Sequence, residues 1–213
     1  MNPPRSPFVP WPAGLELVLA SRSPRRSELL RTAGLPFVII PAPEVEADLA
    51  ATLDHLHHRP AEYAETLAAA KAHAVGERHP AKLVLGADTI VVLDGDILEK
   101  PVDRADAVRL LGRLSGRRHT VITAIALCGG PAGLPPVRRH ARTEVEFLTL
   151  EPAAIERYVD SGEPMDKAGA YGIQGLGALM VRGVRGCYFN VMGLPLALLG
   201  ETMRELFTRQ TSG

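Results

Sequence analysis

Residues 83–93 read LVLGADTIVVL, an apolar run that carries one carboxylate, Asp88, near its middle. The apolar residues on both sides predict a buried strand that is interrupted at residues 86–89. An unpaired carboxylate in such a strand is unfavourable, so Asp88 needs a cation, hydrogen bonds or a chemical role. It is therefore a structural residue bonded to nearby backbone N–H groups, a general base for water, or a metal ligand. If the strand continues without a bend, Thr89 faces the opposite side.

Strands and helices alternate on both sides of this run. Asp94-Gly95-Asp96, directly after it, is a hairpin turn signal. Apolar runs predict further strands, and capping residues and periodicity predict helices. The expected strands cover residues 15–20, 35–40, 119–128 and 137–150, and the expected helices cover 24–33, 60–78, 103–114, 151–159 and 195–209. The mixture of βαβ and hairpin connections indicates an α/β fold around a mixed sheet flanked by helices.

Length and charge limit the class of protein. The chain has 213 residues with a formal net charge of zero, so we expect one domain over residues 15–209 after a flexible Pro-rich extension at 1–14. Neutral charge argues against a protein that coats nucleic acid or a membrane by charge. No apolar run has the length of a signal peptide or a membrane span, so a cytoplasmic location is the default. The oligomeric state stays open, and a homodimer is compatible with the sequence.

Two arginines stand in the opening turn of the first expected helix. Ser23 can cap this helix and Pro24 can begin it, which places Arg25 and Arg26 where cations oppose the helix dipole by about 0.3–1 kcal/mol each. An anionic ligand would remove the conflict, because free N–H groups, dipole and guanidinium groups would then face one anion. On that interpretation, an Arg26→Ala change leaves the ligand-free helix intact or slightly more stable. The alternative is a solvated basic turn.

Two further segments complete a candidate pocket. Lys100 follows the hairpin turn, which would return it toward Asp88, where it is either a phosphate-binding point charge or a surface lysine. The Gly-rich stretch 162–175 carries Lys167 and Gln174 between glycines that permit close backbone approach. The amide of Gln174 offers both a donor and an acceptor, which suits the edge of a pyrimidine or another base. Together these segments predict a pocket for a polyphosphate, with a base for water and a polar group that contacts a nucleobase.

Taken together, these segments resemble the Maf family of nucleotide pyrophosphatases, from Leu17 to about Leu206. The resemblance implies an elongated α/β fold with two lobes and a central cleft, similar to the inosine-triphosphate pyrophosphatase fold. The Pro-rich N-terminus and the loop at 129–136 depart from the family and touch none of its motifs. The matching segments are Ala20 to Leu30, Gly86 to Thr89, Lys100-Pro101, Leu114-Ser115-Gly116 with His119 and residues 121–123, Gly162-Glu163-Pro164, Asp166 to Gly175, Asn190-Val191 and Gly193-Leu194-Pro195.

The resemblance also implies the chemistry and its residues. It implies hydrolysis of a nucleoside triphosphate to the monophosphate and pyrophosphate with a divalent metal cation, Mg²⁺ or Mn²⁺. Asp88 matches the family's proton acceptor. Glu46 matches an acidic cleft position and would hold the metal with Asp88, with Glu44 as the alternative. The polar, phosphate-facing positions are matched by Ser21, Arg25, Arg26, Lys71 and Lys100, to which we add Lys167 of the Gly-rich stretch.

Residues 166–175 resemble the branch of the family that acts on dTTP and UTP. The branch acting on 7-methyl-GTP has serine in place of Ala170 and lacks the Ile-Gln pair. Arg25, Thr89 and Gln174 match the positions that separate the branches. The expected roles are nucleotide-pool sanitation and cell-division arrest. Two alternatives stay open, a pyrophosphatase for a modified purine triphosphate such as 7-methyl-GTP and a non-catalytic nucleotide-binding regulator of cell division.

Overall fold

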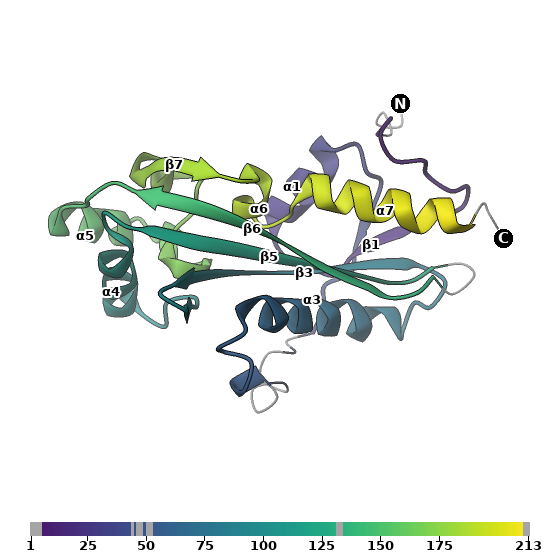
Figure 1. The fold of residues 1–213 in the computed structure, drawn as a ribbon, viewed down its shortest axis with the longest axis horizontal. Coiled ribbons are helices and arrows are strands. Elements are labelled where there is room, and N and C mark those ends of the chain that lie inside the picture. The colour runs from purple at the N-terminus through teal and green to yellow at the C-terminus, as the bar shows by residue number, and fades with distance from the viewer. Residues whose placement is uncertain (1–5, 44, 46–48, 50–52, 131–133, 211–213) are drawn as a thin grey trace.

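The computed structural model describes residues 6–43, 45, 49, 53–130 and 134–210. Its centre is a seven-stranded sheet with the order β2-β1-β3-β5-β6-β7, in which β4 also pairs with β3 (Figure 1). β1 runs parallel to β2 and β3, and the other pairs are antiparallel, so the expected mixed sheet is confirmed. The strands are β1 Leu17–Leu19, β2 Val38–Ile39, β3 Leu83–Leu93, β4 Asp96–Leu98, β5 Arg118–Gly129, β6 Val137–Phe147 and β7 Val181–Arg185.

Helices cover both faces of this sheet. No helix in the described part of the chain has the length and hydropathy needed to cross a bilayer. Three short 3₁₀ helices, η1 to η3, follow α5 and precede the strand β7. The helices are α1 Pro24–Thr32, α3 Pro60–Gly76, α4 Arg104–Leu114, α5 Pro152–Asp160, η1 Glu163–Asp166, η2 Ala168–Ala170, η3 Gly175–Met180, α6 Tyr188–Met192 and α7 Leu196–Gln210.

β3 is continuous, so the interruption expected at residues 86–89 is wrong. Every residue from Leu83 to Val92 pairs with β5, and this antiparallel ladder holds the polar and glycine positions extended. A Cβ atom at Gly86 would lie 2.2 Å from the carbonyl oxygen of Ala68 in α3. The glycine therefore lets α3 pack directly on the strand. The strand expected at 35–40 is also shorter, since only Val38 and Ile39 pair with β1.

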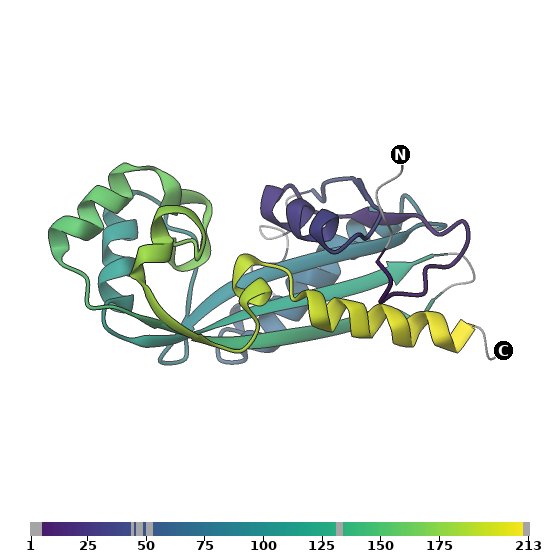
Figure 2. The same ribbon diagram turned by 90° about the horizontal axis from the view of Figure 1, so that it is seen from above.

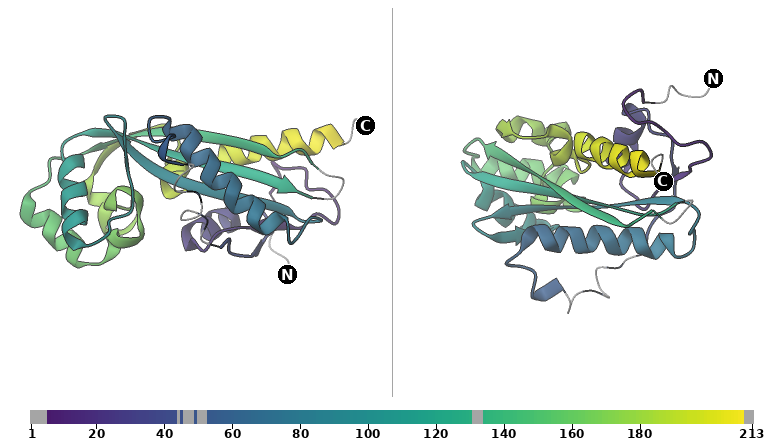
Figure 3. Two further views of the ribbon diagram at one scale, coloured as in Figure 1. Left: turned by 90° about the horizontal axis from the view of Figure 1, so that it is seen from below. Right: turned by 45° about the vertical axis from the view of Figure 1, so that its right-hand side comes forward.

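The core divides the molecule into two lobes. At one end, alternate residues of β3 pack against α1 and α7 on one face of the sheet and against α3 on the other (Figures 1 and 3). At the other end, a separate cluster joins the far ends of β3, β5 and β6 to α4, α5 and η2 (Figure 2). β3 contributes Leu85 to the cluster with α1 and α7, Val84 to the cluster with α3, and Val91 to the cluster with α4 and α5. The long strands therefore pass through both lobes.

The sheet has a gap along one edge of β3. β1 pairs with Leu83–Leu85, and β4 pairs with Val91–Leu93 on the same side. Between them, no strand in the described ranges pairs with residues 86–90 except β5 on the opposite side. Asp88 and Thr89 lie in this gap, where side chains from both faces of the sheet can reach one space.

The N-terminal segment contacts α7 through residues 8, 9 and 11. Val9 is buried in the cluster that also holds Leu199 and Met203 of α7. The ring centroids of Trp11 and Phe207 lie 6.1 Å apart in an edge-to-face arrangement. Residues 1–5 of the expected Pro-rich extension lie outside the described part of the chain.

Candidate active site

A cleft of about 1280 Å³ lies at the gap in β3, between the two lobes. This volume exceeds the roughly 300–1,000 Å³ of a typical small-molecule pocket, so the cleft has room for a large ligand. Its lining includes the start of α1, residues 42–43 and 53–57, residues 63–71 of α3, the gap in β3, the segment after β4, residues 163–175 and the end of α6. Among the described residues the charged lining is nearly balanced, with six basic side chains and five acidic ones: Arg22, Arg25, Arg26, Lys71, Lys100 and Lys167 against Asp54, Asp88, Glu99, Glu163 and Asp166.

Asp88 forms an ion pair at the α3 side of the gap. The Nζ atom of Lys71 in α3 lies 2.7 Å from Asp88 Oδ1, and the two side chains are only 15% and 12% exposed. This cation offsets the unfavourable burial of the carboxylate. Within the described residues, Oδ2 of Asp88 has no hydrogen-bond partner. The carboxylate therefore keeps one oxygen for a water molecule or a cation.

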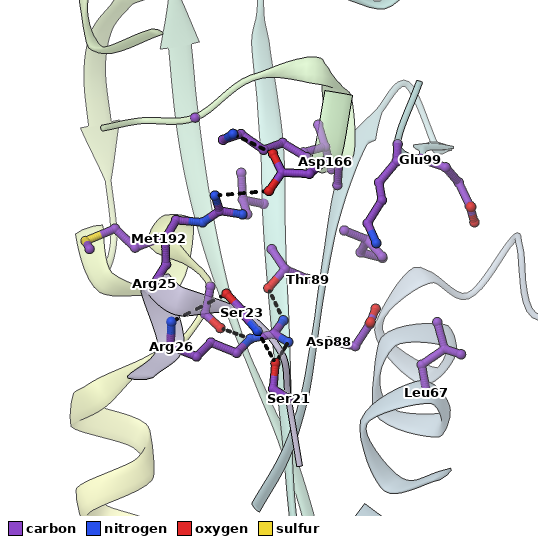
Figure 4. Close-up of a pocket in the computed structure, with 18 of the residues that line it drawn as sticks. Ser21, Ser23, Arg25, Arg26, Leu67, Asp88, Thr89, Glu99, Asp166 and Met192 are labelled. Carbon is purple, nitrogen blue, oxygen red and sulfur yellow. Dashed lines mark hydrogen bonds and ion pairs between the residues drawn. The ribbon is translucent and has the colours of Figure 1, made fainter. Parts of the chain in front are cut away.

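Arg26 joins three segments that are distant in the sequence. Its Nη1 donates to Ser21 Oγ at 3.1 Å, its Nη2 to Thr89 Oγ1 at 3.2 Å and its Nε to the carbonyl oxygen of Gly193 at 2.9 Å (Figure 4). Thr89 thus faces α1, on the side opposite to Asp88, as an uninterrupted strand requires. Ser23 caps α1, as expected, by accepting from the backbone N–H of Arg26. These three partners are neutral, and they hold the guanidinium beside the start of α1, where an anion is favoured.

The contacts of Arg26 revise what its removal should do. We expect Arg26→Ala to lower the free energy of unfolding of the ligand-free protein by about 1–2 kcal/mol, because three cross-links to neutral groups are lost together. Urea unfolding without nucleotide measures this. Arg25→Ala is the matched control, since Arg25 has only a 3.7 Å contact with Asp166 and its loss should change stability by less than about 0.5 kcal/mol. Equal stability of the two variants would contradict the structural role of Arg26.

Arg25 contacts Asp166 in the cleft (Figure 4), and Lys167 pairs with the same carboxylate. Lys167 Nζ lies 2.6 Å from Asp166 Oδ1 and also donates to the backbone carbonyl of Glu163. Partial burial would raise the pKa of the Asp166 carboxyl, but the hydrogen bond from Lys167 and the charges of Lys167 and Arg25 lower it below its ordinary value. The longer contact of Arg25 is the weaker one, so an incoming anion can replace Asp166 at this guanidinium.

Glu163 organises the loop that carries Gln174. Its Oε1 accepts hydrogen bonds from the Tyr158 hydroxyl at 2.9 Å and the Gly177 N–H at 3.2 Å, and its Oε2 accepts from the Leu176 N–H at 3.0 Å. Burial opposes ionisation, but these bonds lower the pKa of the carboxyl below its ordinary value. Gln174 directly precedes this anchored turn and lines the cleft. Among the described residues its side chain has no hydrogen-bond partner, so both groups of the amide are available.

The hairpin returns Lys100 to the cleft that holds Asp88, as the turn signal predicts. Lys100 is exposed and makes no side-chain hydrogen bond or ion pair with the described residues. Its neighbour Glu99 also lines the cleft and accepts a 2.5 Å hydrogen bond from the Tyr63 hydroxyl of α3. Sequence reasoning missed Glu99 and Glu163. Their only signals were a position beside Lys100 and a place in the Gly162-Glu163-Pro164 motif.

The cleft brings nearly all predicted site residues together. Glu46 and its alternative Glu44 lie outside the described residues, so the predicted metal pair has only Asp88 in place. The described chain holds no cluster of three His, Cys, Asp or Glu side chains suited to a metal. Mg²⁺ commonly uses one or two carboxylates together with substrate phosphates, and the available oxygen of Asp88 fits that donor set. The predicted residues that line the cleft are Ser21, Arg25, Arg26, Lys71, Asp88, Thr89, Lys100, Lys167 and Gln174.

Comparison with known proteins gives consistent matches over most of the chain. The family profile described as Maf-like protein matches residues 16–206. A Symbiobacterium thermophilum protein named dTTP/UTP pyrophosphatase is 52% identical over 183 residues, 85% of this chain and 89% of that protein. A Moorella thermoacetica protein of the same name is 53% identical over 188 residues, 88% and 93% of the two chains. The solved nucleoside-triphosphatase / dITP/XTP pyrophosphatase from Mycobacterium abscessus is 17% identical with a TM-score of 0.43, covering 89% of this chain and 94% of that one.

Proposed function

Because the chain belongs to the family of Maf-like proteins, we propose that its cleft hydrolyses dTTP and UTP to the nucleoside monophosphate and pyrophosphate. One observation carries the proposal: a buried carboxylate with an available oxygen, Asp88, shares a cleft with the basic side chains Arg25, Arg26 and Lys100. A binding module for a nucleotide needs the cations. It does not need a carboxylate, which would repel the phosphates.

The basic side chains divide the phosphate contacts between them. Arg26 and the start of α1 offer a guanidinium and backbone N–H groups to the phosphate tail. Lys100 lies on the other lobe's side of the cleft and adds a point charge. Arg25 exchanges its long contact with Asp166 for a phosphate oxygen. Charge on the phosphoryl oxygens and on the departing pyrophosphate is thereby stabilised from both lobes.

Asp88 acts on the attacking water. The oxygen of water forms a bond to the α-phosphorus while the bond from that phosphorus to the bridging α–β oxygen breaks. The electron pair leaves with pyrophosphate, and a proton of the water passes to Asp88 Oδ2. Lys71 keeps Oδ1 in place, so Oδ2 is the oxygen that accepts the proton. In the alternative role, Asp88 Oδ2 and the substrate phosphates would hold a Mg²⁺ or Mn²⁺ ion that offsets phosphoryl charge.

The products test the bond that is cleaved. We expect dTTP and UTP to give only the monophosphate and pyrophosphate, and the reaction to need Mg²⁺ or Mn²⁺. Ion-exchange chromatography of the nucleotides, with a coupled pyrophosphate assay, measures this with and without EDTA. dCTP, GTP and 7-methyl-GTP are the comparison substrates. Release of the diphosphate and orthophosphate would exclude attack at the α-phosphorus, and faster turnover of 7-methyl-GTP would assign the cleft to modified purines.

Gln174 is expected to contact the base. Its amide can donate to O4 and accept from N3–H of thymine or uracil, whereas cytosine presents the opposite pattern. Gln174→Ala should reduce the ratio of kcat/KM for dTTP over dCTP about three- to tenfold, the change expected for one lost neutral hydrogen bond. Steady-state kinetics on both substrates measure the ratio. Glu201→Ala, at an exposed position of the final helix outside the cleft, is the control and should leave the ratio unchanged. An unchanged ratio in Gln174→Ala would place base recognition on other groups.

A further inference from the structure

A buried series of hydrogen bonds leads from Arg26 into the core of the sheet. Arg26 Nη2 lies 3.2 Å from Thr89 Oγ1, which is 3.0 Å from Thr123 Oγ1 on the neighbouring strand β5. Thr123 Oγ1 is in turn 2.8 Å from the backbone carbonyl oxygen of Asn190 in α6. Thr123 and Asn190 are fully buried and neither lines the cleft. Their hydroxyl and amide therefore cannot contact a substrate directly.

The chemistry of the end groups fixes the direction of every bond in the series. The guanidinium of Arg26 can only donate, so Thr89 accepts from it. The carbonyl oxygen of Asn190 can only accept, so Thr123 uses its single proton there. Thr123 must then accept from Thr89, whose own proton points into the core. Thr89 consequently offers no proton to the cleft and holds Arg26 with a lone pair.

Asn190 fixes Thr123 at a second point. Asn190 Oδ1 accepts from the backbone N–H of Thr123 at 3.1 Å, and Asn190 Nδ2 donates to Val121 O at 3.0 Å and Thr143 Oγ1 at 2.9 Å. The same segment holds Arg26 directly, because the carbonyl oxygen of Gly193, three residues further on, accepts from Arg26 Nε at 2.9 Å. The guanidinium is thus fixed to the α6 segment by two routes, one direct and one through both threonines.

We propose that Thr123 is a positioning residue for substrate binding, which sets the proton of Thr89 and through it the orientation of Arg26 toward the phosphates. The inference rests on the proposed function for the identity of the anion. Without the Thr123 hydroxyl, Thr89 is free to rotate and to direct its proton toward Arg26, where two donors would then face each other. The guanidinium loses one of its two routes to α6, and its alignment with the phosphate tail is weakened.

Steady-state kinetics of Thr123→Val and Thr123→Ser with dTTP test this. Thr123→Val replaces the hydroxyl with a methyl group of similar size and should raise KM about three- to tenfold with kcat changed less than twofold, as for one lost neutral hydrogen bond. Thr123→Ser keeps the hydroxyl and should retain the wild-type KM. In an Arg26→Ala background, Thr123→Val should have no further effect on KM, because the residue through which it acts is absent. If Thr123 had a structural role alone, the effects of Thr123→Val and Arg26→Ala on KM would be additive.

Each outcome decides whether Thr123 acts on substrate binding through Arg26 or has a structural role alone. A Thr123→Val protein with wild-type KM, or an increase in KM that persists in the Arg26→Ala background, overturns the inference. If Thr123→Val does not fold, Thr123→Ala removes the same hydroxyl without placing a methyl group against the Asn190 carbonyl, and the same cycle is repeated. Wild-type protein that releases no pyrophosphate from dTTP overturns the proposed function instead. Calorimetric Kd values of dTTP for the same variants then test the inference separately.

Discussion

Asp88→Asn is expected to lower kcat for dTTP about 10²- to 10⁴-fold, the usual contribution of a general base. Asparagine has nearly the same size and keeps an oxygen that can accept from Lys71 Nζ, which lies 2.7 Å from Asp88 Oδ1. The fold should therefore persist, while the group that accepts the proton of water is lost. Pyrophosphate release under substrate saturation measures kcat, and circular dichroism with urea unfolding measures the fold.

Asp96→Asn is the matched control for this change. Asp96 lies in β4, on the same hairpin, and pairs with Arg113 at 2.7 Å outside the cleft, with a side chain that is 65% exposed. The same loss of charge at Asp96 should leave kcat within about twofold of the wild-type value, since exposed ion pairs contribute little to stability. Near-wild-type turnover by Asp88→Asn would make Asp88 a structural residue whose function is to hold Lys71.

Acidification from pH 6.5 to 4 should remove up to about 3 kcal/mol of folding stability through His119. His119 is 3% exposed, and desolvation by burial lowers its pKa to about 4. Its Nε2 lies 2.7 Å from the Tyr171 hydroxyl, and its Nδ1 has no hydrogen-bond partner among the described residues. Between pH 4 and 6.5 the unfolded chain binds a proton here that the folded chain does not. Stability is therefore complete above pH 6.5 and falls as the pH drops.

Urea unfolding at intervals between pH 7 and 4 measures this loss, with His119→Gln as the comparison. Glutamine does not titrate, so the free energy of unfolding of the variant should depend less steeply on pH between 4 and 6.5. The difference between the two pH profiles separates the contribution of His119 from that of the other histidines. Asp166 and Glu163 have lowered pKa values and affect a more acidic range, below their ordinary 3.8 and 4.5. An imidazole NMR titration of His119 with a midpoint near 6.5 would contradict the prediction.

The elements with local signals could be predicted from the sequence. Asp94 and Gly95 form the expected hairpin turn with positive φ angles, and Asp103 caps α4 by accepting from the N–H of Asp106. Pro60 begins α3 as expected. Each of these features depends on residues within a few positions of one another, so the sequence pattern carries the information.

Features that depend on distant pairing could not be predicted. Asp88 and Gly86 look like an interruption in isolation, but the ladder to β5 keeps β3 extended through them. Arg26 looked unfavourable at a helix start because its partner Gly193 is 167 residues away in the chain. The short helix α6 has no local signal, and its Asn190 is held by residues of β5 and β6. Local patterns indicated most of the cleft residues, and the resemblance to the family added Ser21, Lys71 and the role of Thr89.

The passage of β3 and β5 through both lobes determines how the cleft can change its width. A flexible linker lets two lobes rotate freely, whereas a ladder paired at every position from Leu83 to Val92 resists bending and permits only a gradual twist. Displacement under such a twist is smallest at its centre and grows toward the ends. Asp88 lies near the middle of this ladder, opposite Ala124, whereas Lys100 and Lys167 lie on segments outside it. We therefore expect any change in the width of the cleft to leave the carboxylate of Asp88 nearly in place.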